Sequence, residues 1–229
     1  MKIIIPAYKK PHQLERCLAA LRDNVPESDV IVIDNNVTNR GFTKACNDGL
    51  LQTMKSGDRY AMLLNQDCYI EFGAVLNAEN FMNNHPRCAI AGAKQLLDSD
   101  PDFIVHGGCT RAYPRGVHLV GRISNGDCNE SKKMPWINGA LMVVNLAHVP
   151  YIGLMDETMF NFGSESDWCY TARARGFEVW YAANVVCRHE CGESAKPSPE
   201  MERIMENDMG VWKSKWVGSA LHARLVMED

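Results

Sequence analysis

Short apolar runs alternate with amphipathic stretches along most of the chain, and this alternation predicts strands and helices in turn. Runs rich in isoleucine and valine, such as Ile3–Ile5 and Val30–Ile33, are typical of strands in a buried parallel sheet. Between these two runs, Leu14, Leu18 and Leu21 recur at helical spacing among charged residues. A strand, a helix and a second strand in this order predict a right-handed crossover and a largely parallel sheet.

The same pattern assigns elements to the rest of the chain. The expected strands are 2–6, 30–33, 61–64, 89–91, 140–144 and about 178–187, and the expected helices are about 14–21, 43–54, 72–85 and 165–175. The region 98–133 is rich in Gly, Asp, Arg and Asn without a sustained period, so we expect hairpins and loops over the sheet. An amphipathic helical pattern occupies 199–226. We therefore expect one α/β domain.

The first three expected strands each end in a polar segment. These segments are 6–8, 34–36 and 65–67. Ligands of open α/β sheets bind in the crevice beyond the carboxyl ends of the strands. We therefore expect the three segments to line one site.

Composition excludes several classes of protein. The chain has 24 Lys and Arg against 28 Asp and Glu, a formal net charge of −4, so nucleic acid is not an expected partner. No apolar run reaches the ~18 residues of a membrane span, and the first expected strand follows Met1 directly. We expect neither a signal peptide nor a transmembrane anchor.

The nine cysteines are scattered and odd in number, which favours reduced thiols in a cytoplasmic protein. Cys187, His189 and Cys191 lie close together in the sequence and could suggest zinc. A structural zinc site needs four ligands, and no second pair of this spacing accompanies them, so zinc is not the favoured interpretation.

Several polar or aromatic residues could carry chemistry, and each also has a structural explanation. Asp67 could bind a divalent cation beside substrate phosphates, or it could cap a turn. Asp34 could hydrogen-bond a nucleobase or ribose, or it could form an Asx-turn. His189 could ligate a metal or stabilise a turn, and Trp136 could stack on a sugar or belong to the core.

Two carboxylates lie at the start of the helix expected at 165–175. With Ser164 as N-cap, Glu165 and Asp167 fall in the first turn, where the helix dipole stabilises negative charge. One of them could instead face the crevice and deprotonate a sugar hydroxyl as a general base. The sequence leaves both explanations open.

One segment is especially distinctive, because Asn39–Gly49 follows the pattern N-x-G-F-x-x-A-x-N-x-G. Further motifs are Ile5-Pro6-Ala7-Tyr8, Val32-Ile33-Asp34-Asn35, Leu64-Asn65-Gln66-Asp67, Trp136-Ile137-Asn138-Gly139-Ala140, Asp156-Glu157 with Phe160, Ser164–Gly176, and His189. In order and spacing, these segments resemble glycosyltransferase family 2, whose enzymes have the GT-A fold, and particularly its rhamnosyltransferase-like branch. The resemblance covers about 2–192.

The resemblance implies a GT-A-type single domain over 1–229, with a mostly parallel Rossmann-like central sheet flanked by helices. The nucleotide-sugar-binding half would be about 1–97, the acceptor and catalytic half about 98–195, and a C-terminal helical tail about 196–229. Relatives usually carry a helix and a strand where this chain has only the short link from Asn36 to Asn39. The nucleotide-binding half is therefore expected to be trimmed.

The resemblance also implies roles for individual residues. The expected nucleotide-sugar-binding residues are Pro6, Ala7, Tyr8, Asp34, Asn35, Gly41, Lys44, Asn47, Asn65 and Gln66. The expected acceptor-binding residues are Trp136, Asn138 and Gly139, and the expected ligands of Mn²⁺ or Mg²⁺ are Asp67 and His189. The family's Glu-Asp-x-Asp motif reads Ser-Glu-Ser-Asp here, so Glu165 takes the position of the catalytic base and Asp167 is the second candidate.

The implied reaction is an inverting, metal-dependent transfer of a sugar from a UDP- or dTDP-linked donor to a hydroxyl of a glycan, glycolipid or glycoprotein. A nucleotidyltransferase is a weaker alternative, because no glycine-rich loop follows the first strand. A dinucleotide-dependent oxidoreductase would need a G-x-G-x-x-G segment that the chain lacks. A degenerate carbohydrate- or nucleotide-binding module is the non-enzymatic alternative. The tail could cover the acceptor site, form a homodimer or lie peripherally on a membrane.

Overall fold

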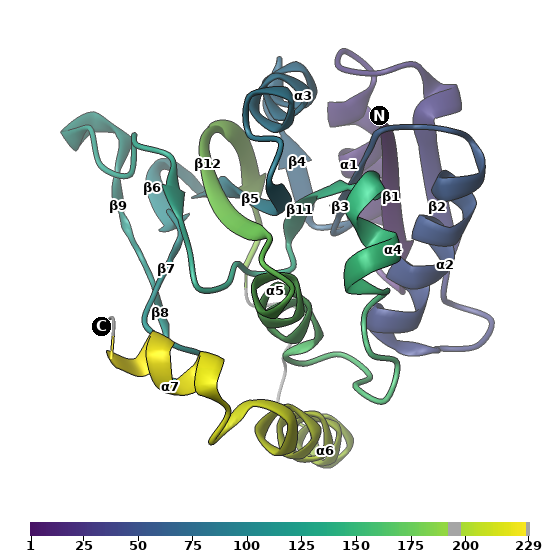
Figure 1. The fold of residues 1–229 in the computed structure, drawn as a ribbon. Helices are drawn as coiled ribbons and strands as arrows, with labels where there is room; N and C mark the ends of the chain where they lie inside the picture. The colour runs from purple at the N-terminus through teal and green to yellow at the C-terminus, as the bar shows by residue number, and fades with distance from the viewer. Residues whose placement is uncertain (192–197, 228–229) are drawn as a thin grey trace.

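The computed structural model describes residues 1–191 and 198–227. Within these ranges a mixed sheet runs through the middle of the molecule and carries helices on both faces (Figure 1). The strands of its main path, in spatial order, are β10 (Lys132–Lys133), β12 (Glu178–His189), β5 (Cys88–Leu97), β11 (Leu141–Asn145), β3 (Tyr60–Leu64), β1 (Lys2–Ala7) and β2 (Val30–Asp34).

Five strands of this path run in the same direction. β1 is parallel to β2 and β3, and β12 is parallel to β5. β11 lies between β3 and β5 and is antiparallel to both, so β5 has the same direction as β3. The prediction of a mostly parallel central sheet flanked by helices is confirmed.

These directions bring the polar segments to one edge of the sheet. The carboxyl ends of β1, β2, β3 and β12 meet there, and the antiparallel β11 begins there. Leu141 of β11 pairs with Leu64 of β3, and the Asn65 amide donates a 2.9 Å hydrogen bond to the Ala140 carbonyl. Asn138 and Gly139 therefore lie beside the segment that follows β3.

The helices divide between the two faces of the sheet. α1 (Pro11–Leu21) and α3 (Ala74–Asn84) cover one face, and α2 (Gly41–Lys55), α4 (Val149–Ile152) and α5 (Ser164–Ala174) cover the other. Side chains alternate between these faces along β1: Ile3 and Ile5 pack with the first group of helices, and Ile4 packs with the second. Continuous burial on both faces explains why the strand reads as an uninterrupted apolar run.

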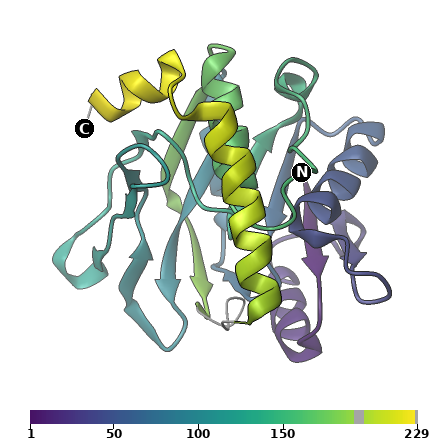
Figure 2. The same ribbon diagram turned by 90° about the horizontal axis from the view of Figure 1, so that it is seen from below.

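Two further helices, α6 (Pro199–Trp216) and α7 (Ala220–Met227), lie outside α5, and Figure 2 shows α6 crossing in front of it. Trp212 of α6 is fully buried and packs edge-on against Tyr113 and Tyr170, at ring-centroid distances of 4.9 and 5.2 Å. The pattern over 199–226 thus corresponds to two helices, with Gly218 at φ 88° between them. None of the described helices combines the length and apolar character needed to cross a membrane.

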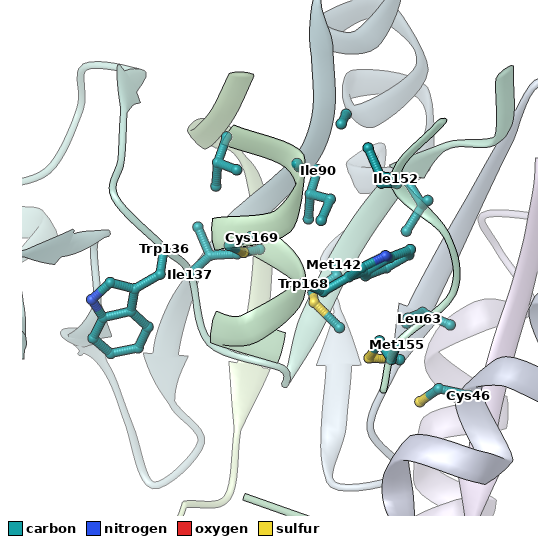
Figure 3. Close-up of a cluster of buried hydrophobic side chains, with 14 of the residues drawn as sticks. Cys46, Leu63, Ile90, Trp136, Ile137, Met142, Ile152, Met155, Trp168 and Cys169 are labelled. Atoms are coloured by element: carbon teal, nitrogen blue, oxygen red, sulfur yellow. The ribbon is translucent and has the colours of Figure 1, made fainter. Parts of the chain in front are cut away.

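The core beneath α5 is built from large side chains of several elements. Figure 3 shows Trp168 of α5 among Met142, Ile152 and Met155. Trp168 is 1% exposed, and its indole nitrogen donates a 2.9 Å hydrogen bond to the Gly153 carbonyl. This packing fixes the position of α5 and hence of the residues at its first turn.

Short strands account for most differences from the sequence-based elements. β4 (Cys68–Ile70), which the sequence did not predict, pairs with the end of β12 and sets His189 opposite Cys68. The region predicted as hairpins and loops contains β6 (Asp100–His106), β7 (Cys109–Thr110), β8 (Val117–His118) and β9 (Gly121–Arg122). β6 pairs with β5 and β9, while β7 and β8 form a separate two-stranded sheet.

Candidate functional site

A cleft of about 520 Å³ lies where the carboxyl ends of β1, β3 and β12 meet the start of β11. The residues proposed from sequence that line it are Pro6, Tyr8, Asn35, Gly41, Asn65, Gln66, Asp67, Asn138, Gly139, Glu165 and His189. A second hollow of about 460 Å³ lies near Tyr60 and Asn145, at the opposite edge of the sheet, and none of the sequence-proposed residues lines it. The first cleft is therefore the candidate site.

An acidic residue and a histidine meet at one side of this cleft. The Asp67 carboxylate is 3.5 Å from Nε2 of His189, and Asp67 is only 4% exposed. The pairing of β4 with β12 produces this contact, and the Glu190 amide strengthens it by donating to the Asp67 carbonyl at 3.1 Å. Burial lowers the pKa of His189, but Asp67 and Cys191 outweigh it and raise that pKa to about 10.

The donor atoms of this pair fit a divalent cation of the Mn²⁺ type. Carboxylate oxygen and neutral imidazole nitrogen are both ligands that Mn²⁺ accepts, so a bound cation would replace the proton that His189 shares with Asp67. Cys68 lies within 4.8 Å of both side chains, but a thiolate is a soft ligand that suits Mn²⁺ and Mg²⁺ less well than oxygen or nitrogen donors. Asp67 and His189 are therefore the residues that would hold the ion.

Glu165 faces the cleft from the first turn of α5. Its methylene chain lies against Gly139, where a Cβ would be 3.6 Å from Glu165 Cγ and 3.2 Å from the Phe42 ring. Burial raises the pKa of Glu165 to about 7. A carboxylate with this pKa can both accept and release a proton near neutral pH, which suits a general base.

Asp167 points to a different part of the molecule. Two residues along a helix correspond to a rotation of about 200°, so Glu165 and Asp167 face opposite ways. Asp167 is 2% exposed, accepts a 2.7 Å hydrogen bond from the Trp216 indole and lies 2.7 Å from Nζ of Lys215. It ties α5 to α6 and does not line the cleft.

Two amide side chains shape the loops that surround the cleft. Gln66 accepts from the Tyr8 amide and donates to the Tyr8 carbonyl, both at 2.9 Å, which fixes the turn after β1. Asn35 accepts from the Arg40 amide at 2.9 Å and donates to the Gly41 carbonyl at 3.2 Å. Both residues line the cleft, and both already have backbone partners.

Several residues proposed for nucleotide binding lie outside the residues that line the cleft. Ala7 is buried within β1, and Asp34 accepts from the amide of Asn36 at 2.8 Å in an Asx-turn. Lys44 is 3.0 Å from Asp48 and 3.2 Å from Glu157. Ala7 thus belongs to the core, and the Asp34 and Lys44 side chains have partners within the chain.

Asn47 and Trp136 also support the surrounding structure. Asn47 is 1% exposed and exchanges hydrogen bonds with the Met155 backbone, donating at 2.8 Å and accepting at 3.1 Å. The Trp136 indole is 4% exposed and donates a 3.0 Å hydrogen bond to the Arg111 carbonyl. Asn138, in contrast, lines the cleft while its amide bonds to Gln95.

The cleft also contains residues that the sequence analysis did not propose. They are Lys9, Lys10, Gln13, Asn39, Phe42, Ala140, Phe160, Asn161 and Met201. Asn39, Phe42, Ala140 and Phe160 belong to motifs quoted above, so the sequence carried a signal for them. Lys9 and Lys10 lie in the turn after β1 with φ of 54° and 51°, and they add positive charge beside the cleft.

Replacing Gly41 by alanine is expected to destabilise the fold by about 2 kcal/mol or more. Gly41 has φ 83°, and a Cβ there would lie 2.3 Å from the Phe160 carbonyl oxygen. The matched control is Gly210→Ala in α6, where the added Cβ meets no atom within 4 Å apart from the neighbouring helix backbone, and helix propensity favours alanine by about 1 kcal/mol. Urea denaturation of both variants measures the difference. A Gly41→Ala protein as stable as the wild type would contradict the close approach of these loops.

The chain was compared with known families and solved structures. The profile of the family described as "Glycosyltransferase like family 2" matches residues 1–205. None of the curated proteins compared with the chain matches it. Three of the solved structures that resemble it do so across most of its length, and each shares less than 15% sequence identity with it.

The first is GalNAc-T7 with UDP, GalNAc and Mn²⁺, which has a TM-score of 0.64 and 13% identity over 90% of this chain and 47% of that chain. The second is TarS of S. aureus, with a TM-score of 0.55 and 14% identity over 90% of this chain and 38% of that chain. The third is the mannosyltransferase PcManGT of Pyrobaculum calidifontis with GDP-Man and Mn²⁺. It has a TM-score of 0.52 and 12% identity over 84% of this chain and 57% of that chain.

This chain thus spans about half the length of the solved structures that it resembles. Their similarity confirms the GT-A fold expected from the sequence. The family profile covers most of the chain, including every residue proposed for the cleft. The chain belongs to the glycosyltransferase-like family 2.

Proposed function

We propose that this protein transfers a sugar from a nucleoside diphosphate sugar, UDP- or dTDP-linked, to a hydroxyl group of a glycan-type acceptor with inversion at the anomeric carbon. In this proposal residues 1–97 bind the donor and residues 98–195 bind the acceptor. The rhamnosyltransferase-like motifs favour a hexosyl or deoxyhexosyl donor. The observation that carries the proposal is one cleft lined both by the Asp67 and His189 pair and by Glu165.

Glu165 is the proposed base. Its carboxylate would take the proton from the acceptor hydroxyl as the oxygen attacks the anomeric carbon, and the glycosidic bond to the diphosphate would break in the same displacement. Gly139, one of the proposed acceptor-binding residues, lies against Glu165, and Asn138 lines the same cleft. Holding both substrates in line supplies a large part of the rate by proximity.

Asp67 and His189 would hold Mn²⁺ or Mg²⁺, which supplies charge neutralisation for the departing diphosphate. Lys9 and Lys10 add positive charge from the turn after β1. GalNAc-T7 and PcManGT, which share this fold, were solved with Mn²⁺ and with UDP or GDP-Man. The similarity supports a nucleotide donor in the same part of this chain.

Calorimetric titration with UDP, dTDP and GDP, each with Mn²⁺, Mg²⁺ or EDTA, tests the donor site. We expect UDP or dTDP to bind only with a divalent cation present. Binding would then select the sugar donors for an assay of transfer to hydroxyl acceptors, in which the anomeric configuration of the product reports inversion. A folded protein that binds none of the three nucleotides would contradict the donor site.

Replacing Asp67 by alanine should abolish the cation-dependent part of nucleotide binding. The variant removes the buried carboxylate and leaves His189 as the remaining proposed ligand. Asp23→Ala is the matched control, because it makes the same change in net charge at an exposed position just after α1. Calorimetry with Mn²⁺ compares the two. If Asp67→Ala kept the wild-type response to Mn²⁺, the assignment of the cation to this pair would be wrong.

A further inference from the structure

A second group of metal-binding side chains lies among the short strands of the region 98–133. His106 ends β6, Cys109 begins β7 and His118 ends β8. The pairing of β7 with β8 sets Cys109 opposite His118, and the turn through Gly108, at φ 103°, brings His106 beside them. None of the three residues lines the catalytic cleft proposed above.

The ligand atoms of this group are close enough to share one ion. Nδ1 of His106 is 3.1 Å from Nδ1 of His118, and Sγ of Cys109 is 4.0 Å from Nδ1 of His106. All three lie within 4.8 Å of one another. Tetrahedral zinc with bonds of about 2.0 Å to nitrogen and about 2.3 Å to sulfur separates two nitrogens by about 3.3 Å, and nitrogen from sulfur by about 3.6 Å. The separation of His106 from His118 and that of His106 from Cys109 differ from these values by a few tenths of an ångström.

The burial of His106 supports a ligand at its Nδ1. The side chain is 0% exposed, and within the described residues its Nε2 has no hydrogen-bond partner. The polar contacts of the ring therefore run through Nδ1, toward His118 and Cys109. A hydrogen bond between the two Nδ1 atoms would explain why His106 and His118 are close, but it would not explain why the Cys109 thiol lies beside them. A shared metal ion explains the positions of all three side chains.

The surroundings of the group suit a site with three protein ligands. The Tyr181 and Trp136 rings lie 6.5 Å from His106 and 5.7 Å from His118 by ring centroids, which provides an apolar wall. His118 is exposed, so an ion can reach the group from solvent and a water can complete its coordination. Nitrogen and sulfur donors are those that zinc prefers.

We propose that His106, Cys109 and His118 bind Zn²⁺, with water as the fourth ligand. On binding, the Cys109 thiol releases its proton to solvent and coordinates as a thiolate, while both imidazoles bind in the neutral form. The ion ties β6, β7 and β8 together. His106 pairs in the sheet with Gln95, whose amide bonds to Asn138 in the cleft, so the ion would also stiffen the acceptor side of the proposed transferase site. Only this last consequence rests on the proposed function.

Titration of the chelator-treated protein with Co²⁺ tests the site, because thiolate coordination gives a charge-transfer absorption in the near ultraviolet. We expect this absorption in the wild type and in the controls Cys128→Ser and Cys68→Ser, and its loss in Cys109→Ser. His118→Gln, at an exposed position, should weaken Co²⁺ binding by about tenfold or more. Circular dichroism establishes that each variant is folded, and Zn²⁺ should raise the Tm of the wild type but not of Cys109→Ser.

Two results would overturn the proposal. A folded wild type without the charge-transfer absorption would leave His106 and His118 as a hydrogen-bonded pair. Loss of the absorption in Cys68→Ser but not in Cys109→Ser would place the thiolate beside Asp67 and His189. Nucleotide binding, measured on the same samples by calorimetry, reports separately on the proposed donor site, so failure of one proposal is distinguishable from failure of the other.

Discussion

Replacing Glu165 by glutamine should lower transfer turnover by about 10²- to 10⁴-fold and leave donor binding nearly unchanged. Glutamine has the same shape but cannot accept the acceptor proton. Glu165 belongs to α5, whereas Asp67 follows β3 and His189 ends β12, so the donor's cation would be held by other elements. Turnover and calorimetric binding of the donor nucleotide, measured on the same preparation, separate the two effects. Full transfer activity in Glu165→Gln would exclude Glu165 as the base.

The pH dependence of turnover should also report the role of Glu165 as the base. Burial raises the pKa of Glu165 to about 7, and only the ionised carboxylate can accept a proton. Turnover of the wild type is therefore expected to rise about tenfold per pH unit below pH 7 and to level off above it. The residual activity of Glu165→Gln should lack this step. A wild-type profile that is flat between pH 5 and 8 would contradict the assignment.

The same carboxyl group should cost the protein stability at high pH. Its pKa is raised from 4.5 in the unfolded chain to about 7 in the fold, so between these values the folded state binds more protons than the unfolded state. The free energy of unfolding therefore falls as pH rises through this window, by at most about 3 kcal/mol. Glu165→Gln should be more stable than the wild type at pH 8 and similar to it at pH 4.

Asp167→Asn provides the contrast for these measurements. Asp167 contacts Lys215 and Trp216 between α5 and α6, and it lies outside the cleft. Its replacement removes an ion pair and should lower stability while preserving the step in the pH profile. Because Glu165 and Asp167 lie two residues apart on one helix, the variants differ in which face of α5 they alter.

The parts of the fold that the sequence predicted best are those with continuous burial. β1, β2 and β3 were expected close to their observed positions, because buried parallel strands need unbroken apolar runs such as Ile3–Ile5. β4 has three residues, and β7, β8, β9 and β10 have two residues each. Strands this short cannot show the alternation of apolar and polar residues from which a strand is predicted. β4 and β10 pair with β12, which approaches them only in the folded chain, while β9 pairs with β6 and β7 pairs with β8.

The candidate site was predictable to the extent that it follows from strand direction. The rule for carboxyl ends of parallel strands anticipated Pro6, Asn65 and Asp67 together in one cleft. It could not reveal that Trp136 bonds to the Arg111 carbonyl or that Met201 of α6 reaches the cleft, because both depend on contacts between distant segments. The opposite orientation of Glu165 and Asp167 was, in contrast, predictable from helical geometry, because residues two positions apart on a helix face nearly opposite sides.

Replacing Asp208 of α6 should have a large effect on stability, because Asp208 holds the loop 160–162 that lines the cleft. Its carboxylate is fully buried and accepts hydrogen bonds from three consecutive backbone amides, those of Phe160, Asn161 and Phe162, at 2.8 to 2.9 Å. Phe160 and Asn161 line the cleft, and Glu165 follows them on the same segment. Asp208 is therefore a positioning residue that acts through this loop.

Asp208→Ala leaves three buried amides without their acceptor, and we expect the free energy of unfolding to fall by about 4 kcal/mol. Asp208→Asn keeps one carbonyl oxygen as acceptor and should lose about half as much. Glu206→Ala, at an exposed position of the same helix, is the control and should stay within about 0.5 kcal/mol of the wild type. Urea denaturation measures all three.

Turnover distinguishes positioning from stability alone. Under conditions where Asp208→Asn remains folded, we expect kcat to fall while KM for the donor stays close to the wild-type value, because the loop from 160 to 162 leads to Glu165 and not to the Asp67 and His189 pair. If instead folded Asp208→Asn turned over at the wild-type rate, the contact of α6 with this loop would stabilise the protein without orienting the base. α6 would then cover the proposed catalytic half without taking part in the geometry of transfer.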